Sequence, residues 1–149
     1  MAMDPRLNGY LIRALGHEMA AVQQYMAQSK LCELWGFTDF AARFRQEAVE
    51  ELGHVESLME ALLKLGIAPH ASQLPPVRLG RTLQEMLEID RVLEVEAVHL
   101  YEEAAAYCIR LRNSAQHALF DRILHDELGH LKELDQVLET LQNKEHSHA

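Results

Sequence analysis

Apolar residues recur every three or four positions along four long segments of this 149-residue chain. The segments span about 7–34, 40–65, 82–111 and 114–141, and a short turn at 35–37 separates the first two. This spacing places the apolar side chains on one face of a helix. The pattern therefore predicts four amphipathic helices, each of about 25 to 30 residues, and no strands.

Polar and turn-forming residues mark the expected ends of these helices. Asp4, which precedes a proline, is a good start signal, and Gly66 is a good stop signal. Thr82 with Glu85 three residues later forms a capping-box pattern that begins the third helix. The pair at 113–114 separates the third helix from the fourth.

The second and third helices are joined by a long linker at 66–81, which contains three of the four prolines. An extended linker of this length reaches about 50 Å, enough to travel along a whole bundle. We therefore expect an all-α fold, a ferritin-like four-helix bundle with one long crossover between helices 2 and 3. Residues 1–142 form this single domain, with halves at about 7–65 and 82–141, and residues 143–149 form a flexible tail.

Composition narrows the class of protein. The chain has 23 acidic and 14 basic side chains, a net charge of −9, and 48% hydrophobic residues. That hydrophobic content supports a packed core and excludes a disordered chain. The acidic surplus disfavours nucleic acids and anionic membranes as partners and suits cations. No segment resembles a signal peptide or a membrane span, so we expect a soluble, cytoplasmic protein.

The two halves of the chain repeat each other at an offset of 76 positions. The tetrapeptide Glu-Leu-Gly-His occurs at 51–54 and again at 127–130, and upstream Glu18 matches Glu94 at the same offset. Each half therefore contributes one Glu from its first helix and a Glu-x-x-His from its second.

This duplicated set has a chemical meaning. Residues three apart lie on one face of a helix, so each Glu-x-x-His can grip one metal ion. Four carboxylates and two imidazoles that project inward from four helices are the ligand set of di-iron and di-manganese bundles. Without metal, four buried carboxylates would repel and cost several kcal/mol each in desolvation. We expect a dinuclear metal site formed by Glu18, Glu51, His54, Glu94, Glu127 and His130.

These residues resemble the bacterioferritin family over about residues 7–142. The spacing of the six side chains is similar to the ferroxidase centre of that family, and the segments 24–25, 35–36 and 86–87 together with Asp90 also fit its pattern. The resemblance implies that Glu51 and Glu127 bridge two iron ions, and that the other four ligands are terminal. It further implies a ferroxidase that oxidises Fe(II) with O2 or H2O2 and stores ferric mineral in a hollow oligomer.

The haem site of the family is where the sequence departs from it. Bacterioferritins hold haem between two subunits through a methionine just after the glutamate of the second helix, and here that position is Leu52. Leucine cannot ligate iron, so haem bound in the usual way is not expected. Met19 and Met26 are alternative candidate sulfur ligands for a haem. A second subunit type that binds haem is a further possible partner.

The resemblance also concerns assembly. A shell of 24 identical subunits is expected, with a shell of twelve as the rival because the tail is too short for the family's fifth helix. A ferredoxin-type reductant is a further candidate partner. His146 and His148 are expected to belong to a frayed tail rather than to bind metal.

Other polar residues near the six ligands have more than one interpretation. Tyr25 and its repeat partner Tyr101 are expected to hydrogen-bond metal carboxylates or to pack structurally, and the resemblance gives Tyr25 a catalytic role as an extra electron donor. Gln46 stands where some relatives place a histidine of an inner iron site. Glu47 and Glu50 beside it are expected to face water, with inward transfer of iron as the alternative.

Two alternatives to ferroxidase and storage stay open. A rubrerythrin-like peroxidase or oxidase would turn the metals over without storing iron, although the chain has no Cys-x-x-Cys pairs for a rubredoxin domain. The other alternative is a metal-free structural bundle.

Overall fold

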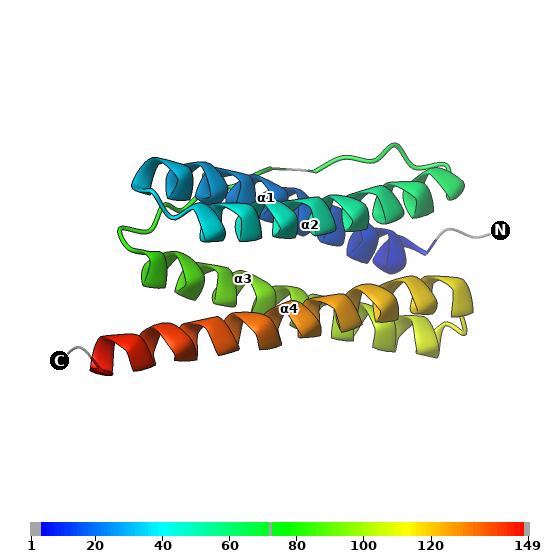
Figure 1. Ribbon diagram of the computed structural model, residues 1–149. Coiled ribbons are helices and arrows are strands. Elements are labelled where there is room, and N and C mark those ends of the chain that lie inside the picture. The colour runs from blue at the N-terminus through cyan, green and yellow to red at the C-terminus, as the bar shows by residue number, and fades with distance from the viewer. Residues whose placement is uncertain (1–3, 72, 148–149) are drawn as a thin grey trace.

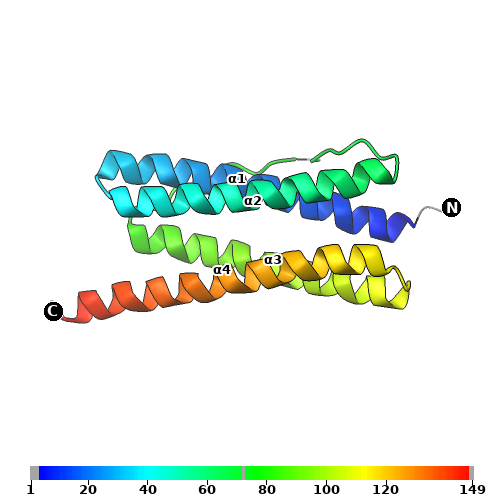
Figure 2. The ribbon, with the colours of Figure 1, turned by 45° about the vertical axis from the view of Figure 1, so that its right-hand side comes forward.

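The computed structural model describes residues 4–71 and 73–147 and contains four long helices: α1 (Pro5–Trp35), α2 (Thr38–Lys64), α3 (Leu83–Arg110) and α4 (Ser114–Ser147). Helices α1 and α2 form one antiparallel hairpin, α3 and α4 form another, and the two hairpins lie side by side (Figure 1, Figure 2). The segment between α2 and α3 runs back along the bundle, so these two helices are parallel (Figure 1). The expected four-helix bundle with one long crossover is confirmed.

Local hydrogen bonds explain where the helices begin and end. The Asp4 carboxylate accepts two bonds of 3.0 Å from backbone N–H groups in the first turn of α1. The Thr82 hydroxyl accepts from the Glu85 N–H at 3.1 Å, and the Glu85 carboxylate accepts from the Arg81 N–H at 2.7 Å. Gly36 ends α1 in the left-handed conformation, with a φ of 85° that glycine adopts without strain.

The fourth helix is longer than the pattern predicts. It continues to Ser147, whereas the apolar periodicity ends at about Leu141. The added residues include no glycine or proline, and Gln142, Lys144 and Glu145 are good helix formers, so nothing local stops the helix. Most of the expected tail is therefore helical, while His148 lies outside the described residues.

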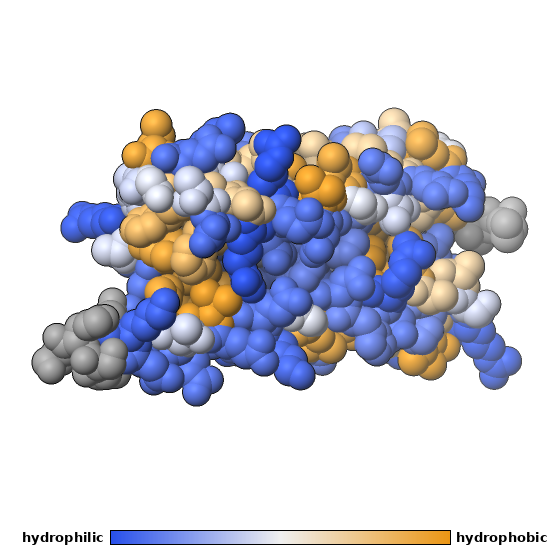
Figure 3. Space-filling view, in the orientation of Figure 1, coloured by the Kyte–Doolittle hydropathy of each residue, from blue (hydrophilic) through white to orange (hydrophobic). Residues whose placement is uncertain are grey.

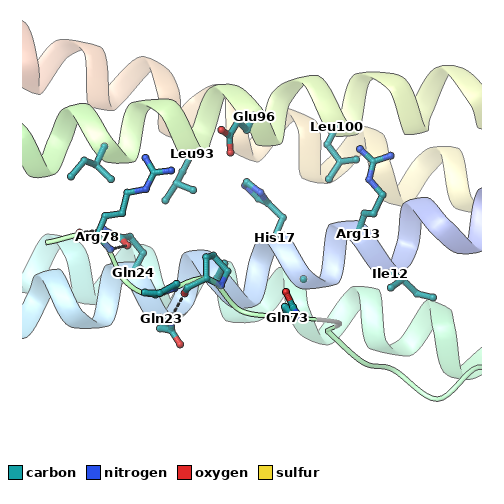
Figure 4. A pocket seen from close by; sticks show the side chains of 15 residues that line it. Ile12, Arg13, His17, Gln23, Gln24, Gln73, Arg78, Leu93, Glu96 and Leu100 are labelled. Atoms are coloured by element: carbon teal, nitrogen blue, oxygen red, sulfur yellow. Dashed lines mark hydrogen bonds between the residues drawn. The ribbon is translucent and has the colours of Figure 1, made fainter.

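The crossover segment is attached to α1 by two neighbouring glutamines. The Gln24 amide donates to the Arg78 carbonyl at 2.7 Å and accepts from the Arg78 N–H at 3.0 Å. Gln23 donates to the Pro75 carbonyl at 3.0 Å (Figure 4). A recess of about 490 Å³ lies between this segment, α1 and α3, and none of the six expected ligands lines it.

The buried core consists of two apolar clusters at different levels of the bundle. One includes Leu15, Leu58 and Phe120, and the other includes Phe44 and Met86. On each helix, the expected metal ligands lie in sequence between the residues of one cluster and those of the other. On the face formed by α2 and α4, hydrophilic residues gather around the middle, and apolar residues are exposed towards the ends (Figure 3). Among the described helices, none combines the length and hydropathy that a membrane span requires.

Candidate metal centre

The structure brings all six expected ligands together between the two apolar clusters. Each helix contributes at least one of them, and none of the four glutamates is more than 2% exposed. His54 is 8% exposed, and its ring lies 6.4 Å from that of His130, centroid to centroid. The helices and their side chains are Glu18 from α1, Glu51 and His54 from α2, Glu94 from α3, and Glu127 and His130 from α4.

The donor atoms form two groups that share two glutamates. In each group the ligand atoms lie within 4.8 Å of one another. Glu51 and Glu127 belong to both groups, so their carboxylates can bridge two adjacent ions. The first group is completed by Glu18 and His54, and the second by Glu94 and His130.

Several buried polar atoms in this cluster make no hydrogen bond of good geometry, which is costly inside a protein, and for most of them the nearest polar contact is an ion pair of 3.1–3.5 Å within the cluster. They are the Oε2 atoms of Glu18 and Glu94, the Oε1 atoms of Glu51 and Glu127, and Nδ1 of His130. All but one are oxygens that only accept. Cations supply what these atoms lack, so the residues fit a pair of metal ions.

The carboxylates strongly influence one another and the two imidazoles. Burial and the nearby Glu127 raise the pKa of Glu94 well above its ordinary value. Burial acts to lower the pKa of His130, but the surrounding glutamates outweigh it and raise that pKa to about 10. The pKa of His54 is raised in the same way by the carboxylates of Glu127, Glu18 and Glu51, which lie 3.1–3.5 Å from its Nδ1. In the metal-free protein these protons offset part of the buried negative charge, and a bound ion would displace them.

Two buried tyrosines connect the hairpins at the cluster. The Tyr25 hydroxyl on α1 donates to Glu94 on α3, and the Tyr101 hydroxyl on α3 donates to Glu18 on α1 at 2.6 Å. The expected hydrogen bonds to ligand carboxylates are therefore present for both phenols, and the repeat makes them equivalent.

Two acidic residues that the sequence analysis did not include among the site residues contact the histidines. His54 Nε2 donates to Asp126 at 2.9 Å, and His130 Nε2 donates to Glu50 at 2.6 Å. The repeat offset relates these two acids, each directly before a shared glutamate. The repeat itself could have identified these two acids, because both directly precede the repeated Glu-Leu-Gly-His tetrapeptide. Since one is Glu and the other Asp, they are not part of the identical match. Glu50 faces water as expected, with 43% of its side chain exposed, and in addition it accepts a hydrogen bond from His130.

Glu47 is more buried than expected. Its side chain is 15% exposed, and Oε2 is buried without a hydrogen-bond partner. Burial raises the pKa of this group to about 7, against the lowering effect of His130. Glu47, Glu50 and His130 form a third group of donor atoms within 4.8 Å, but the repeat partner of Glu47 is the buried Ile123, so the other side has no counterpart.

The cluster reaches solvent along the seam between α2 and α4. A groove of about 620 Å³ lies over this seam and is lined by Glu50, Asp126 and both clustered histidines, among others. Among the described residues, the other histidines join no group of metal-binding donor atoms: His17, His70, His99, His117 and His125. Leu52 is 46% exposed, while Met19 and Met26 pack against the apolar clusters.

Comparisons with known proteins agree with this geometry. A model of the ferritin-like domain family matches residues 9–143. The bacterioferritin of Rhodobacter capsulatus is 33% identical over 135 residues, which cover 91% of this chain and 84% of that protein. The bacterioferritin of Mycolicibacterium paratuberculosis is 33% identical over 141 residues, which cover 95% of this chain and 89% of that protein.

The fold is also similar to a solved structure. The Rhodobacter capsulatus bacterioferritin superposes with a TM-score of 0.92 at 31% identity, and the match covers 96% of this chain and 89% of that chain. That structure is described as having a metal-free dinuclear site and a haem iron in a crystallographic special position.

Proposed function

Because the chain belongs to the ferritin-like family and, within it, to the bacterioferritins, which are iron-storage proteins of the ferroxidase type, we propose that each subunit oxidises Fe(II) at a dinuclear centre. The ferric product is stored as mineral in a hollow homo-oligomer. The observation that carries the proposal is the buried cluster of four glutamates and two histidines, whose donor atoms converge in two groups within 4.8 Å.

In this proposal the six side chains hold two ions, two of them as bridging ligands and four as terminal ligands. Glu51 and Glu127 bridge, Glu18 and His54 complete one position, and Glu94 and His130 complete the other. Oxygen donors with one imidazole per ion accept both Fe(II) and Fe(III). When both irons are bound, each can supply one electron to O2 or H2O2.

Tyr25 is the further catalytic residue of the proposal. Its hydroxyl holds the terminal ligand Glu94, and burial together with the charge of Glu94 raises the pKa of the phenol well above its ordinary value. The proton therefore stays on Tyr25 until the ring gives an electron to the O2 or H2O2 that is reduced at the centre. Glu94, ionised once it holds an iron ion, is in place to accept that proton.

The acidic groove over the α2–α4 seam is the route by which Fe(II) reaches the centre. The side chains of Glu50 and Asp126 are 43% and 52% exposed, so each is accessible from solvent while it also contacts a histidine of the cluster. Negative side chains at the mouth of a groove concentrate cations there.

Methionine-ligated haem is not part of this proposal. Leu52 has no donor atom, and the two methionines considered as substitutes, Met19 and Met26, pack against the core clusters. We expect the purified protein to contain iron without a haem spectrum.

Rapid mixing of the metal-free protein with Fe(II) in air tests the proposal. We expect about two Fe(II) per subunit to be oxidised in a fast phase, from the two positions of the cluster. Glu94→Ala and His130→Ala should abolish this phase, because each removes a terminal ligand. Glu96→Ala and His117→Ala, on the same helices but outside both the cluster and the groove, are the matched controls. Unchanged fast oxidation in both ligand variants would refute the proposal.

A di-iron peroxidase or oxidase without storage is the second candidate. The bond between Tyr101 and Glu18 favours it, because it makes the two ends of the centre nearly equivalent. Light scattering separates the candidates: a storage shell has a mass of hundreds of kilodaltons, whereas the 17.0 kDa chain as a dimer has a far smaller one. A metal assay of the purified particle addresses the metal-free alternative.

A further inference from the structure

The outer nitrogen of each clustered histidine is bound by a carboxylate from the opposite hairpin. His54 on α2 donates to Asp126 on α4, and His130 on α4 donates to Glu50 on α2. The two contacts cross the seam in opposite directions. Since the repeat offset relates both the histidines and the acids, the same device occurs twice in one chain.

These contacts determine which nitrogen faces the cluster. His54 Nδ1 lies 3.1 Å from Glu127 and 3.2 Å from Glu51, while its Nε2 is occupied by Asp126. His130 Nδ1 likewise lies 3.2 Å from Glu51. A carboxylate on the far nitrogen fixes the orientation and tautomer of an imidazole and makes the inward nitrogen a better ligand.

The packing of the bundle supplies no substitute for these contacts. Helices α2 and α4 touch each other far less than the helices within each hairpin do. The two rings also border the open groove over the seam, which gives them room to turn outward. Asp126 and Glu50 are the carboxylates that bind the outer nitrogens of the imidazoles across this seam, while Glu127 and Glu51 lie at the inner nitrogens.

We propose that Asp126 and Glu50 are positioning residues of the metal centre, each holding one histidine so that Nδ1 points at an ion. Asp126 orients His54, which shares its metal position with Glu18. Glu50 orients His130, which shares its metal position with Glu94. The inference rests on the proposed dinuclear centre and adds two residues to its machinery.

Zn(II) binding to the metal-free oligomer, measured by calorimetry, tests the inference without iron oxidation. Loss of an outer carboxylate that orients a metal-binding histidine costs about 10- to 100-fold in metal affinity. Asp126→Ala and Glu50→Ala should each weaken one of the two Zn(II) positions by that factor. Asp126→Glu and Glu50→Asp should retain most of the affinity, because the repeat already uses a carboxylate of either length at this place.

Matched controls separate the lost contact from the lost charge. Asp121→Ala on α4 and Glu56→Ala on α2 each remove one acidic side chain that contacts neither clustered histidine, and should bind Zn(II) as the parent does. A nitrogen-15 NMR spectrum of the Zn(II)-loaded protein gives a second measurement. The parent should show both histidines with protonated Nε2, and each alanine variant should show a mixture of ring states for one histidine.

The outcomes distinguish this inference from the proposed function. If the parent fails to bind two Zn(II) per subunit, the dinuclear centre itself is refuted. If the parent binds both ions and the alanine variants bind them equally well with unchanged ring states, only the positioning role is refuted. Should an alanine variant fail to fold, Asp126→Asn and Glu50→Gln, which keep an acceptor but lose the charge, replace it and are expected to bind more weakly than the parent.

Discussion

Asp90 is a buried carboxyl group that lies outside the metal cluster. One of its oxygens accepts a hydrogen bond of 2.7 Å from the Gln28 amide nitrogen. The other oxygen has no partner, and neither does the amide oxygen of Gln28. Burial raises the pKa of Asp90 to about 8.

This group should make the stability of the metal-free protein depend on pH. An unfolded Asp has a pKa of about 4. Between that value and about 8 the folded state keeps a proton that the unfolded state releases, so the free energy of unfolding falls as the pH rises. One such group contributes a slope of about 1.4 kcal/mol per pH unit.

Asp90→Asn should remove that slope. The new amide nitrogen can donate to the unpaired oxygen of Gln28, so both orphaned atoms gain a partner. Urea unfolding of the metal-free variant and parent between pH 5 and 9 measures the effect. The variant should become progressively more stable than the parent as the pH rises, and parallel curves would contradict the raised pKa.

At this scale the sequence predicts ligands better than it predicts their supports. Glu18 and Glu94 could be found because helical spacing and the repeat fix which face they occupy. The repeat offset also relates Glu50 to Asp126, but it does not show that either carboxylate contacts a histidine. Whether a surface acid reaches a histidine depends on how α2 crosses α4, and that crossing follows from tertiary packing.

The junction between the crossover segment and α3 requires a glycine. A Cβ added to Gly80 would lie 2.8 Å from the backbone nitrogen of Met86 and 3.1 Å from Cβ of Glu85. The neighbours are the first turn of α3, which is held by the cap at Thr82 and cannot easily move.

Gly80→Ala should therefore destabilise the protein, whereas Gly9→Ala should stabilise it. Overpacking of this kind costs about 1–3 kcal/mol. Gly9 lies inside α1, and a Cβ added there meets nothing within 4 Å, so alanine gains about 1 kcal/mol from helix propensity. Urea unfolding of the two variants compares the same chemical change in two environments. Shifts of the same sign would contradict the predicted close approach at Gly80.

Helix starts follow from the sequence more readily than the path between helices. Asp4 and Thr82 cap their helices through contacts within three residues, so the signal is local. The path of the crossover depends on the hydrogen bond from the Gln24 amide to the Arg78 carbonyl, and these two residues are 54 positions apart in sequence. Linker length predicts that the segment can span the bundle, but it does not predict which face the segment follows.

The whole molecule is a doubled hairpin with a charged layer inside an apolar bundle. The repeat predicts this arrangement because two equal halves must bring equal residues to one level. The layer is also the least favourable part of the metal-free fold, since four buried glutamates share it with only two histidines. Glu127 illustrates the conflict, because it raises the pKa of Glu94 beside it.

Divalent metal should therefore stabilise the protein. Removal of one shared carboxylate should stabilise the metal-free protein instead and should weaken the stabilisation by metal. A ligand that binds only the folded state stabilises it by about 2.7 kcal/mol at 100 times its dissociation constant. Glu127→Gln removes one of the mutually repelling charges, and its amide oxygen can still accept from His54, so the metal-free variant should unfold at a higher temperature than the metal-free parent. The variant also loses a bridging ligand, so Zn(II) should raise its unfolding temperature little, whereas the parent should gain strongly and lose that gain on addition of a chelator. Thermal unfolding of both proteins with and without Zn(II) measures all four states. If the metal-free variant were less stable than the metal-free parent, Glu127 would stabilise the bundle without a bound ion. The burial of this carboxylate would then not require a metal ion.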